Sequence, residues 1–399
     1  MPASSQLVWR SGDLKGELVD FARARRFARA FRQALEQRFG GTVVTDEGEF
    51  INFLDWFVLE HRLPSGRTVV EEFVAARPEL PEEERAMLLG WREVVEGLFE
   101  VQRRDGEALV TVNLIDELPY RLRSNVGPSV FSQMPRGSFV ITRLVPIGDE
   151  WLISGATNVL PASSGAEARG VALQIATRYP RLVFRNPDRL ARGWELQREQ
   201  RRHFVDFFGS DLVVLPGREL AERMRAYGRF LMDEARDAEG RSVAERARQR
   251  YGSVPATADL GDLPAELVEA DTVGVLYDEV EGLNYLANFG LLQETFANPK
   301  LATDREHRQA VVGYLKDPSV SPLALRRLAE PDAERAGRVF QQVLRRPGFS
   351  WERDGEALLR RHKADWFERT VLPSVVPVGP TLVDPEQPAR RSRKGGRRA

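Results

Sequence analysis

Residues 101–115 read Val101-Gln-Arg-Arg-Asp-Gly-Glu-Ala-Leu-Val-Thr-Val-Asn-Leu-Ile115, with strand-like runs on both sides of an Asp-Gly pair. This pair predicts a β-hairpin, because Asp-Gly tolerates the positive backbone angles of a tight two-residue turn. Residues 137–155 repeat the arrangement, with Gly148-Asp149 at the centre of a second predicted hairpin. These two hairpins decide the predicted fold.

The chain between the two hairpins is interrupted by Pro119, Pro128 and Pro135. Because a lone hairpin is marginally stable in water, we expect four to six short strands that curl on themselves. The sequence therefore predicts one small SH3-like or OB-like β-barrel at about residues 100–162.

The segments on both sides of the predicted barrel have the apolar spacing of helices. Apolar residues recur at this spacing over residues 13–39, and Asp46 with Glu49 predicts a capped start for an apolar helix that ends at His61. A later helix is expected to run from Pro81 to Phe99, and the helical pattern returns at residue 166. The predicted fold class is therefore α+β, mostly helical with one inserted barrel.

We expect the chain to form six successive parts. They are an N-terminal helical domain (1–99), the β-barrel (100–162), an Arg-rich helical region (163–240), a linker (241–263), a C-terminal helical domain (264–372) and an extended to disordered basic tail (373–399).

Composition narrows the class of protein. Hydrophobic residues make up 42% of the chain and charged residues 29%, which is ordinary for a soluble globular protein. No run approaches the roughly 18 apolar residues of a membrane helix, and the N-terminal sequence lacks the apolar core of a signal peptide. The chain has no cysteine, which excludes disulfides, thiolate zinc sites and a cysteine nucleophile. We predict a cytoplasmic protein without membrane association.

The familiar signatures of nucleotide-binding proteins, hydrolases and zinc proteases are absent from the sequence. Asp55 and Glu60 lie on the apolar helix that ends at His61 and are the candidate catalytic residues, since a buried carboxylate can act as a tuned acid or base. The structural alternative is that these carboxylates face an arginine across a helix interface.

Asp278, Glu279 and Glu281 are the candidate metal ligands, because hard cations prefer oxygen donors. The alternative is a solvated helix start. No cofactor is predicted.

An Arg-rich stretch follows the predicted barrel and is the first candidate for nucleic-acid contact. Interleaved arginines and aromatic residues suit phosphate binding combined with base stacking. The alternative is that the arginines form ion pairs within the protein. The candidate residues are Arg178, Arg181, Arg185, Arg189, Arg192 and Trp194.

The C-terminal end is a second candidate for contact with a polyanion. It carries six basic residues and no acid, while the whole chain has a net charge of −1. Such a run can bind RNA, DNA or a ribosomal surface through counterion release, or it can act as a solubilising terminus. Its basic residues are Arg390, Arg391, Arg393, Lys394, Arg397 and Arg398.

Three stretches together resemble bacterial proteins of unknown function that often end in a SEC-C motif, a cysteine-rich zinc knuckle. They are Phe53-Leu-Asp-Trp-Phe through Leu63-Pro-Ser-Gly-Arg-Thr68, Gly90-Trp91 through Glu100-Val101, and Phe349-Ser-Trp-Glu-Arg-Asp-Gly-Glu356. This chain has no cysteine and cannot carry the knuckle, so zinc is not implied. The resemblance implies a C-terminal element that meets a polyanion or a protein, and it implies no activity.

These observations favour a non-enzymatic binding or adaptor protein. Its barrel, the adjacent Arg-rich helices and the basic tail would contact RNA, DNA, a ribosomal surface or a protein partner. Two alternatives remain open: a hydrolase or metal-assisted enzyme that uses the helix carboxylates, and a structural component of a multiprotein assembly.

Overall fold

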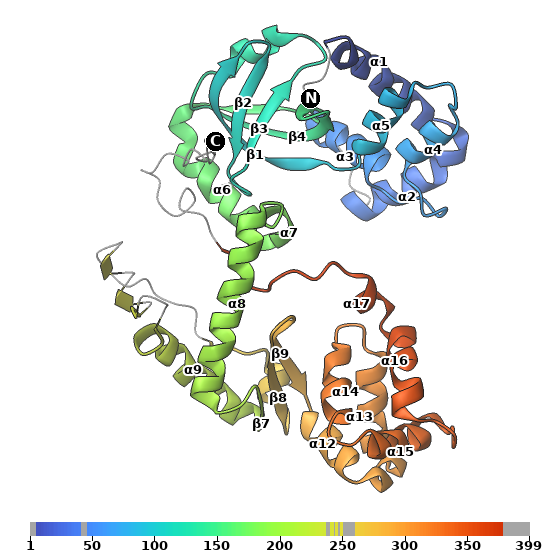
Figure 1. The fold of residues 1–399 in the computed structure, drawn as a ribbon, viewed down its shortest axis with the longest axis vertical. Coiled ribbons are helices and arrows are strands. Elements are labelled where there is room, and N and C mark those ends of the chain that lie inside the picture. The colour runs from blue at the N-terminus through green and yellow to red at the C-terminus, as the bar shows by residue number, and fades with distance from the viewer. Residues whose placement is uncertain are drawn as a thin grey trace, which may run out of the picture. The chain divides into compact units, whose positions relative to one another are not determined.

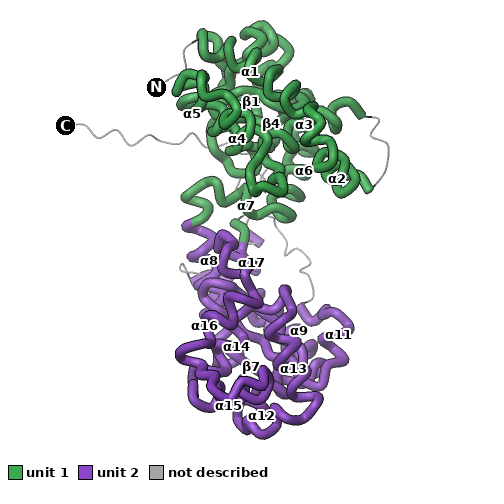
Figure 2. The backbone as a smooth tube through the Cα atoms, turned by 90° about the vertical axis from the view of Figure 1, so that its right-hand side faces the viewer, with its two compact units in different colours: residues 1–190, 376–399 green, residues 191–375 purple. Residues whose placement is uncertain are grey.

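The computed structural model describes residues 5–40, 46–236, 240–242, 244–245, 248–249 and 260–377. The chain forms two compact units, residues 1–190 with 376–399 and residues 191–375 (Figure 2). The fold is α+β and mostly helical, and it includes a small closed five-stranded β-barrel, as the sequence predicts.

The first unit begins with helices that share an apolar core. These are α1 (Ser5–Ala22), the 3-10 turn η1 (Arg25–Phe27), α2 (Ala28–Phe39), α3 (Glu47–Leu59), α4 (Val69–Ala75) and α5 (Glu82–Gly90). Phe53 and Phe57 of α3 are fully buried in this core. Asp46 accepts the backbone N–H of Glu49 at 2.7 Å, which confirms the predicted start of α3. Thr68 begins α4 with a capping box.

The barrel follows these helices and shares their unit (Figure 1). Its strand order is β1-β2-β3-β5-β4, and β4 returns to pair with β1, which closes the barrel. The β3–β5 pair is parallel, whereas the other pairs are antiparallel. This is the Greek-key order of an OB-fold. The strands are β1 (Val95–Asp105), β2 (Ala108–Asn113), β3 (Pro119–Arg123), β4 (Phe139–Ile147) and β5 (Glu150–Ile153), and β6 (Asn158–Leu160) adds to β4.

Both predicted hairpins are confirmed. β1 pairs with β2 across Gly106-Glu107, one residue later than the predicted Asp105-Gly106 turn, and β4 pairs with β5 across Gly148-Asp149. Gly106 and Gly148 have positive φ angles of 62° and 57°, which these tight turns require.

β1 is the longest strand of the barrel because it pairs with two strands, β2 and β4. Its residues 95–100 pair with β4, and its residues 99–105 pair with β2. The register shifts between Val101 and Arg103, and such a bulge bends and twists a strand. In the barrel core, the rings of Phe99 and Tyr120 meet edge to face at 5.4 Å.

The helix predicted from Pro81 to Phe99 is wrong in its second half. α5 ends at Gly90, and β1 begins at Val95. Gly97 weakens a helix, and the β-branched Val94-Val95 pair favours a strand. The ladders that β1 forms on both sides are long-range pairings, and the local apolar spacing does not reveal them.

Further helices follow the barrel. They are the 3-10 turn η3 (Ala162–Ser164), α6 (Gly165–Arg178), α7 (Pro180–Val183) and α8 (Pro187–Phe208). The boundary between the two units falls after Leu190, within α8. The predicted Arg-rich region, residues 163–240, is therefore divided between the units.

The second unit combines a three-stranded antiparallel sheet with helices. The sheet has the order β7-β8-β9 and consists of β7 (Leu212–Leu215), β8 (Val273–Asp278) and β9 (Gly282–Ala287). The helices are α9 (Gly217–Asp233), α11 (Ala265–Val268), α12 (Phe289–Ala297), α13 (Arg305–Lys316), α14 (Pro322–Ala329), α15 (Ala333–Leu344), α16 (Trp351–His362) and α17 (Ala364–Glu368), with the 3-10 turn η4 (Pro299–Thr303).

The hairpin of β8 and β9 corrects the prediction that this region contains helices alone. Val273, Val275 and Tyr277 of this run are β-branched or aromatic, which suits a strand. Gly282 supplies a positive φ of 74° where the turn ends. Of the predicted linker (241–263) and basic tail (373–399), most residues lie outside the described part of the chain.

No helix among the described residues is both long and apolar enough to cross a membrane.

A close contact inside the barrel predicts opposite effects for two glycine substitutions. A Cβ atom on Gly97 would lie 2.6 Å from Oδ1 of Asn113, a buried side chain that accepts the backbone N–H of Ile115. We expect Gly97→Ala to lower the free energy of unfolding by about 1–3 kcal/mol. The control is Gly170→Ala in α6, where a Cβ atom meets no atom within 4 Å.

Gly170→Ala should be neutral or stabilising by up to about 1 kcal/mol, because alanine favours a helix. Urea unfolding of both variants measures the difference. Equal effects of the two substitutions would contradict the predicted clash.

Candidate functional site

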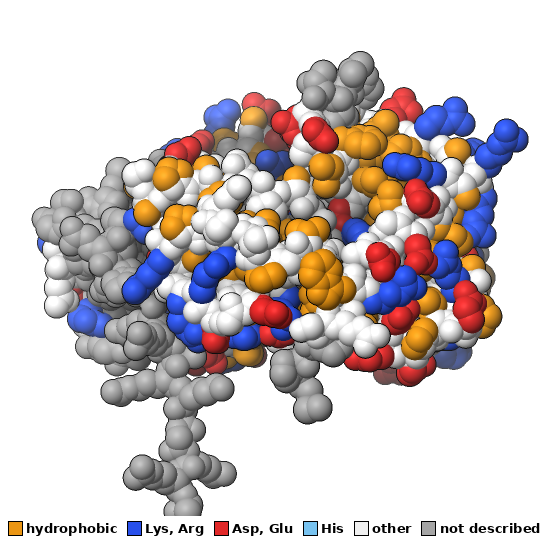
Figure 3. Space-filling model, turned by 90° about the horizontal axis from the view of Figure 1, so that it is seen from above, with side chains coloured by type: hydrophobic (Ala, Val, Ile, Leu, Met, Phe, Trp, Pro, Cys, Tyr) orange, Lys and Arg blue, Asp and Glu red, His pale blue; other side chains and the backbone are white. Residues whose placement is uncertain are grey.

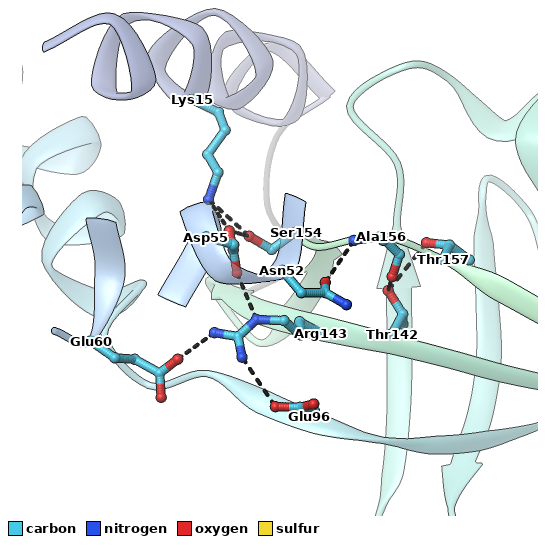
Figure 4. A network of polar contacts seen from close by, with 10 residues as sticks. All are labelled: Lys15, Asn52, Asp55, Glu60, Glu96, Thr142, Arg143, Ser154, Ala156 and Thr157. Atoms are coloured by element: carbon cyan, nitrogen blue, oxygen red, sulfur yellow. Dashed lines mark hydrogen bonds and ion pairs between the residues drawn. The ribbon is translucent and has the colours of Figure 1, made fainter. Parts of the chain in front are cut away.

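A buried ion-pair network joins the N-terminal helices to the barrel (Figure 4). Asp55 of α3 is 3% exposed and lies at its centre. Arg143 of β4 donates from Nε to Oδ2 of Asp55 at 2.8 Å. Lys15 of α1 binds Oδ1 of Asp55, and the hydroxyl of Ser154 donates to the same oxygen at 2.6 Å. One carboxylate thus connects α1, α3 and the barrel.

Arg143 holds two further carboxylates. Its other guanidinium nitrogens bind Glu60 and, at 3.1 Å, Glu96. The candidate catalytic residues Asp55 and Glu60 therefore both bind one arginine across an interface. This arrangement is the structural alternative that the sequence leaves open.

The charge states of the network follow from its contacts. Burial alone would raise the pKa of the Asp55 carboxyl, but the nearby charges of Lys15 and Arg143 outweigh burial and lower it. Burial alone would lower the pKa of the Arg143 guanidinium, but Asp55 and Glu60 raise it. Both groups are therefore charged at neutral pH, as a permanent ion pair requires.

Two arginines of the barrel are also neutralised within the protein. Arg121 donates to Glu150 at 2.7 Å and also binds Asp105. Arg123 donates to the second oxygen of Glu150 at 3.2 Å and to Glu107 at 2.8 Å. These arginines hold β3 to β5 and to the β1–β2 turn, so their charges are not available to a partner.

The other three arginines of the barrel surround one small hollow of about 260 Å³, which we call the arginine hollow. All three are exposed, and no carboxylate lines the hollow. Its lining residues are Val101, Arg103, Arg104, Phe131, Ser132, Met134, Pro135 and Arg136.

The three guanidinium groups of the arginine hollow differ in their partners. Arg136 forms no hydrogen bond or ion pair with the described part of the chain. Arg104 donates to the carbonyl oxygen of Pro128 at 2.8 Å, which leaves its charge uncompensated. Arg103 lies 3.2 Å from Asp105, a carboxylate that it shares with Arg121. The hollow therefore presents excess positive charge.

The arginines predicted from the sequence around residues 178–192 do not form one free cluster. Arg189 binds Glu117, and Arg185 approaches the hydroxyl of Tyr120. Arg178 stacks over the ring of Tyr179 at 5.5 Å. Arg181 is exposed and has no partner among the described residues.

The last two residues of that prediction belong to the second unit. Arg192 pairs with Glu195 at 3.0 Å, and Trp194 is half-buried. Of this group, only Arg178 and Arg181 are both exposed and without a polar partner in the described structure.

The candidate metal ligands point to separate partners. Asp278 accepts the backbone N–H groups of Val280 and Glu281, both at 2.8 Å, in the turn between β8 and β9. Glu279 lies 3.7 Å from Arg201, and Glu281 lies 3.5 Å from Arg369. The described residues contain no group of three His, Cys, Asp or Glu side chains placed to hold a metal ion.

The candidate residues of the basic tail lie outside the described part of the chain. They are Arg390, Arg391, Arg393, Lys394, Arg397 and Arg398.

Asp116 is a buried titratable group that the sequence analysis missed. Its Oδ2 accepts the hydroxyl of Tyr120 at 2.6 Å, and its Oδ1 accepts the backbone N–H of Leu118 at 2.9 Å. Burial raises the pKa of the Asp116 carboxyl to about 6, and burial together with Asp116 raises the pKa of Tyr120. The sequence signal is faint, since a single aspartate in a sequence normally faces solvent.

Comparisons with protein-family models, with curated proteins and with solved structures returned no match. The resemblance to proteins with a SEC-C motif therefore stays a prediction.

The Asp55 network predicts a large effect for one substitution. Arg143→Met leaves Asp55 buried with half of its compensating charge, and breaking a buried pair in this way typically lowers stability by about 3–5 kcal/mol. The control is Arg104→Met, which removes an exposed arginine from the same barrel and should change stability by no more than about 0.5 kcal/mol. Urea unfolding measures both, and a small effect at Arg143 would contradict the structural role.

The raised pKa of the buried Asp116 carboxyl predicts that the protein is less stable at neutral pH than at mildly acidic pH. Because folding raises the pKa of its carboxyl from 3.8 to about 6, the folded state binds the proton more tightly between these values. The stabilisation is complete below the unfolded pKa and is lost as the pH rises through about 6.

Asp116→Asn removes this titration. From pH 7.5 to pH 4.5, the wild type should gain on the order of 2 kcal/mol relative to the variant. Denaturant unfolding of both proteins across this range measures the gain, and a constant difference would contradict the raised pKa.

Proposed function

We propose that the protein is a non-enzymatic binding or adaptor protein whose barrel contacts the phosphate backbone of a nucleic acid through the arginine hollow. One observation carries the proposal: Arg103, Arg104 and Arg136 surround a hollow that no carboxylate lines. Guanidinium groups bind phosphate oxygens through paired hydrogen bonds, and they keep their charge at any physiological pH.

In the proposed contact, the arginines bind phosphates and no side chain recognises a base. Base stacking needs an exposed aromatic ring, and Phe131, the aromatic residue of the hollow, is 2% exposed. The large exposed aromatic residues of the described chain are Trp9, Phe50 and Tyr179, and none of them lines the hollow. Contacts to phosphates position a protein on nucleic acid without reading sequence. We therefore expect binding with little sequence preference.

The charge of the rest of the surface supports a local contact. On the face drawn in Figure 3, basic and acidic side chains are interspersed, and neither sign covers the surface. The net charge of the chain is −1, so long-range attraction to a polyanion is weak. Binding would depend on a few close arginines, to which the exposed Arg178 and Arg181 and the basic residues 390–398 could add.

A protein or ribosomal partner is the main competitor of this proposal, since an acidic protein surface also suits three arginines. The predicted cytoplasmic location is compatible with either partner. The enzyme alternative gains no support, because Asp55 and Glu60 are bound to Arg143. Binding to naked nucleic acid distinguishes the proposal from its competitor.

The proposal predicts a defined salt dependence. Each phosphate contact to duplex DNA contributes about 0.9 to the slope of log K against log salt concentration. The triple variant Arg103→Gln, Arg104→Gln, Arg136→Gln should therefore reduce the slope by roughly 2–3 and weaken binding at low salt. Fluorescence anisotropy with a labelled 20-base-pair duplex, in DNA and RNA forms, measures both quantities.

A charge-matched control separates the hollow from general charge. The triple variant Arg338→Gln, Arg346→Gln, Arg353→Gln removes the same charge from exposed positions of the second unit and should leave the slope unchanged. Deletion of residues 388–399 measures the contribution of the tail separately. Absence of binding by the wild type, or an unchanged slope in the hollow variant, would refute the proposal.

A further inference from the structure

A second cavity in the first unit has different lining residues from the arginine hollow. It has a volume of about 430 Å³ and lies between α1 and the barrel, with walls from β5, β6, the 3-10 turn η2 (Pro128–Gln133) and the loop that precedes η2. This volume is within the range of cavities that hold small organic molecules. We call it the seam cavity, because it lies where β5 ends and β6 begins.

The walls of the seam cavity are about half apolar. The apolar side chains include Met134, directly after η2, and Val145, Leu152 and Val159 of β4, β5 and β6. Val126 lies at the cavity with 69% of its surface exposed. The ring of Trp9, itself 56% exposed, lies beside the neighbouring Gly127. An apolar wall with an exposed apolar rim suits a ligand that has a hydrocarbon body.

Trp91 supplies an unused hydrogen-bond donor. It lines the cavity and is 1% exposed, and its indole Nε1 has no acceptor among the described residues. A buried N–H group without an acceptor is unfavourable by about 1–3 kcal/mol, so such groups are rare in folded proteins. This nitrogen has less than 1 Å² of accessible surface, so it lies just behind the cavity wall. A ligand acceptor would satisfy it after a small shift of the indole ring or of the side chains in front of it.

Lys15 supplies a second donor close to the first. Its Nζ lies 5.5 Å from the centre of the Trp91 ring and lines the same cavity. Two of its three hydrogens have acceptors, Asp55 and the hydroxyl of Ser154. The third hydrogen has no acceptor among the described residues and can be donated to a ligand oxygen. It is the one charged residue in the lining, and no carboxylate lines the cavity.

These features select a class of ligand. A polyphosphate would need several cations, and the lining offers one. A purely apolar ligand would leave the Trp91 N–H group without an acceptor. We propose that the seam cavity binds a small organic monocarboxylate with an apolar body, whose carboxylate oxygens accept from Trp91 Nε1 and Lys15 Nζ. This proposal is independent of nucleic-acid binding.

The test uses octanoate as the probe, with octanamide as its neutral isostere, on the full chain labelled with ¹⁵N at its seven tryptophans. Trp91→Phe identifies the indole resonance of Trp91 by its loss. We expect octanoate to shift this resonance downfield in a saturable, one-to-one manner, because its N–H group gains an acceptor. Octanamide should bind roughly tenfold or more weakly, because it lacks the charge that Lys15 recognises.

Calorimetry on variants completes the test. Trp91→Phe keeps an aromatic ring but removes the donor, and Lys15→Met removes the cation; each should weaken octanoate binding roughly tenfold or more. Trp366→Phe is the control, since Trp366 belongs to the second unit and does not line the cavity, and it should bind like the wild type. An unshifted Trp91 resonance, equal binding of octanamide, or wild-type affinity in Trp91→Phe would overturn the proposal. The first two outcomes need no destabilised variant.

Discussion

The ion pair between Asp55 and Arg143 is the contact on which the first unit depends. It crosses from α3 to β4, and Lys15 extends it to α1. Apolar packing follows the same path, because Val145, Ile147 and Leu152 of the barrel belong to the core of the N-terminal helices. A buried ion pair is often no more stabilising than well-packed apolar residues. Its specific effect here is to fix which helix faces which strand.

The ion-pair network around Asp55 also positions two walls of the seam cavity. Lys15 and Ser154 both bind Asp55 and both line the cavity. The network therefore holds one wall from α1 and one wall from the end of β5 at a fixed separation. Trp91, at the end of α5, is buried between the helices and the barrel. Its indole N–H group has no acceptor among the described residues. The same interaction thus orders the interface and leaves one buried donor beside the cavity without an acceptor in the described structure.

The arginines of the barrel divide into two groups by their partners. Arg121, Arg123 and Arg143 bind carboxylates that lie within the unit. The arginines of the hollow are exposed, and Asp105, which pairs with Arg103, is shared with Arg121. Arginine is abundant in this chain, so an arginine-rich stretch in the sequence does not indicate binding. Whether an arginine is available for binding follows from the partners of its guanidinium group in the structure.

The sequence predicts the parts of the fold that depend on local chemistry. Asp105-Gly106 and Gly148-Asp149 mark both hairpins of the barrel, and Asp46 marks the start of α3. The sequence-based prediction fails where long-range strand pairing determines the structure. Phe99, for example, lies in a strand because β4 and β2 flank β1. The arginine hollow was not predicted for the same reason, since the fold brings Arg136 to Arg103 and Arg104 from a distant segment. Asp116 was missed because its burial depends on packing.

We propose that the barrel uses one set of arginines for stability and another for binding. Single Arg→Gln substitutions at each of the six positions test it, with urea unfolding and affinity for a labelled duplex measured on every variant. We expect that substitution of Arg121, Arg123 or Arg143 lowers stability, while substitution of Arg103, Arg104 or Arg136 lowers affinity at unchanged stability. Variants of the hollow that bind normally, or that lose stability as much as affinity, would contradict it.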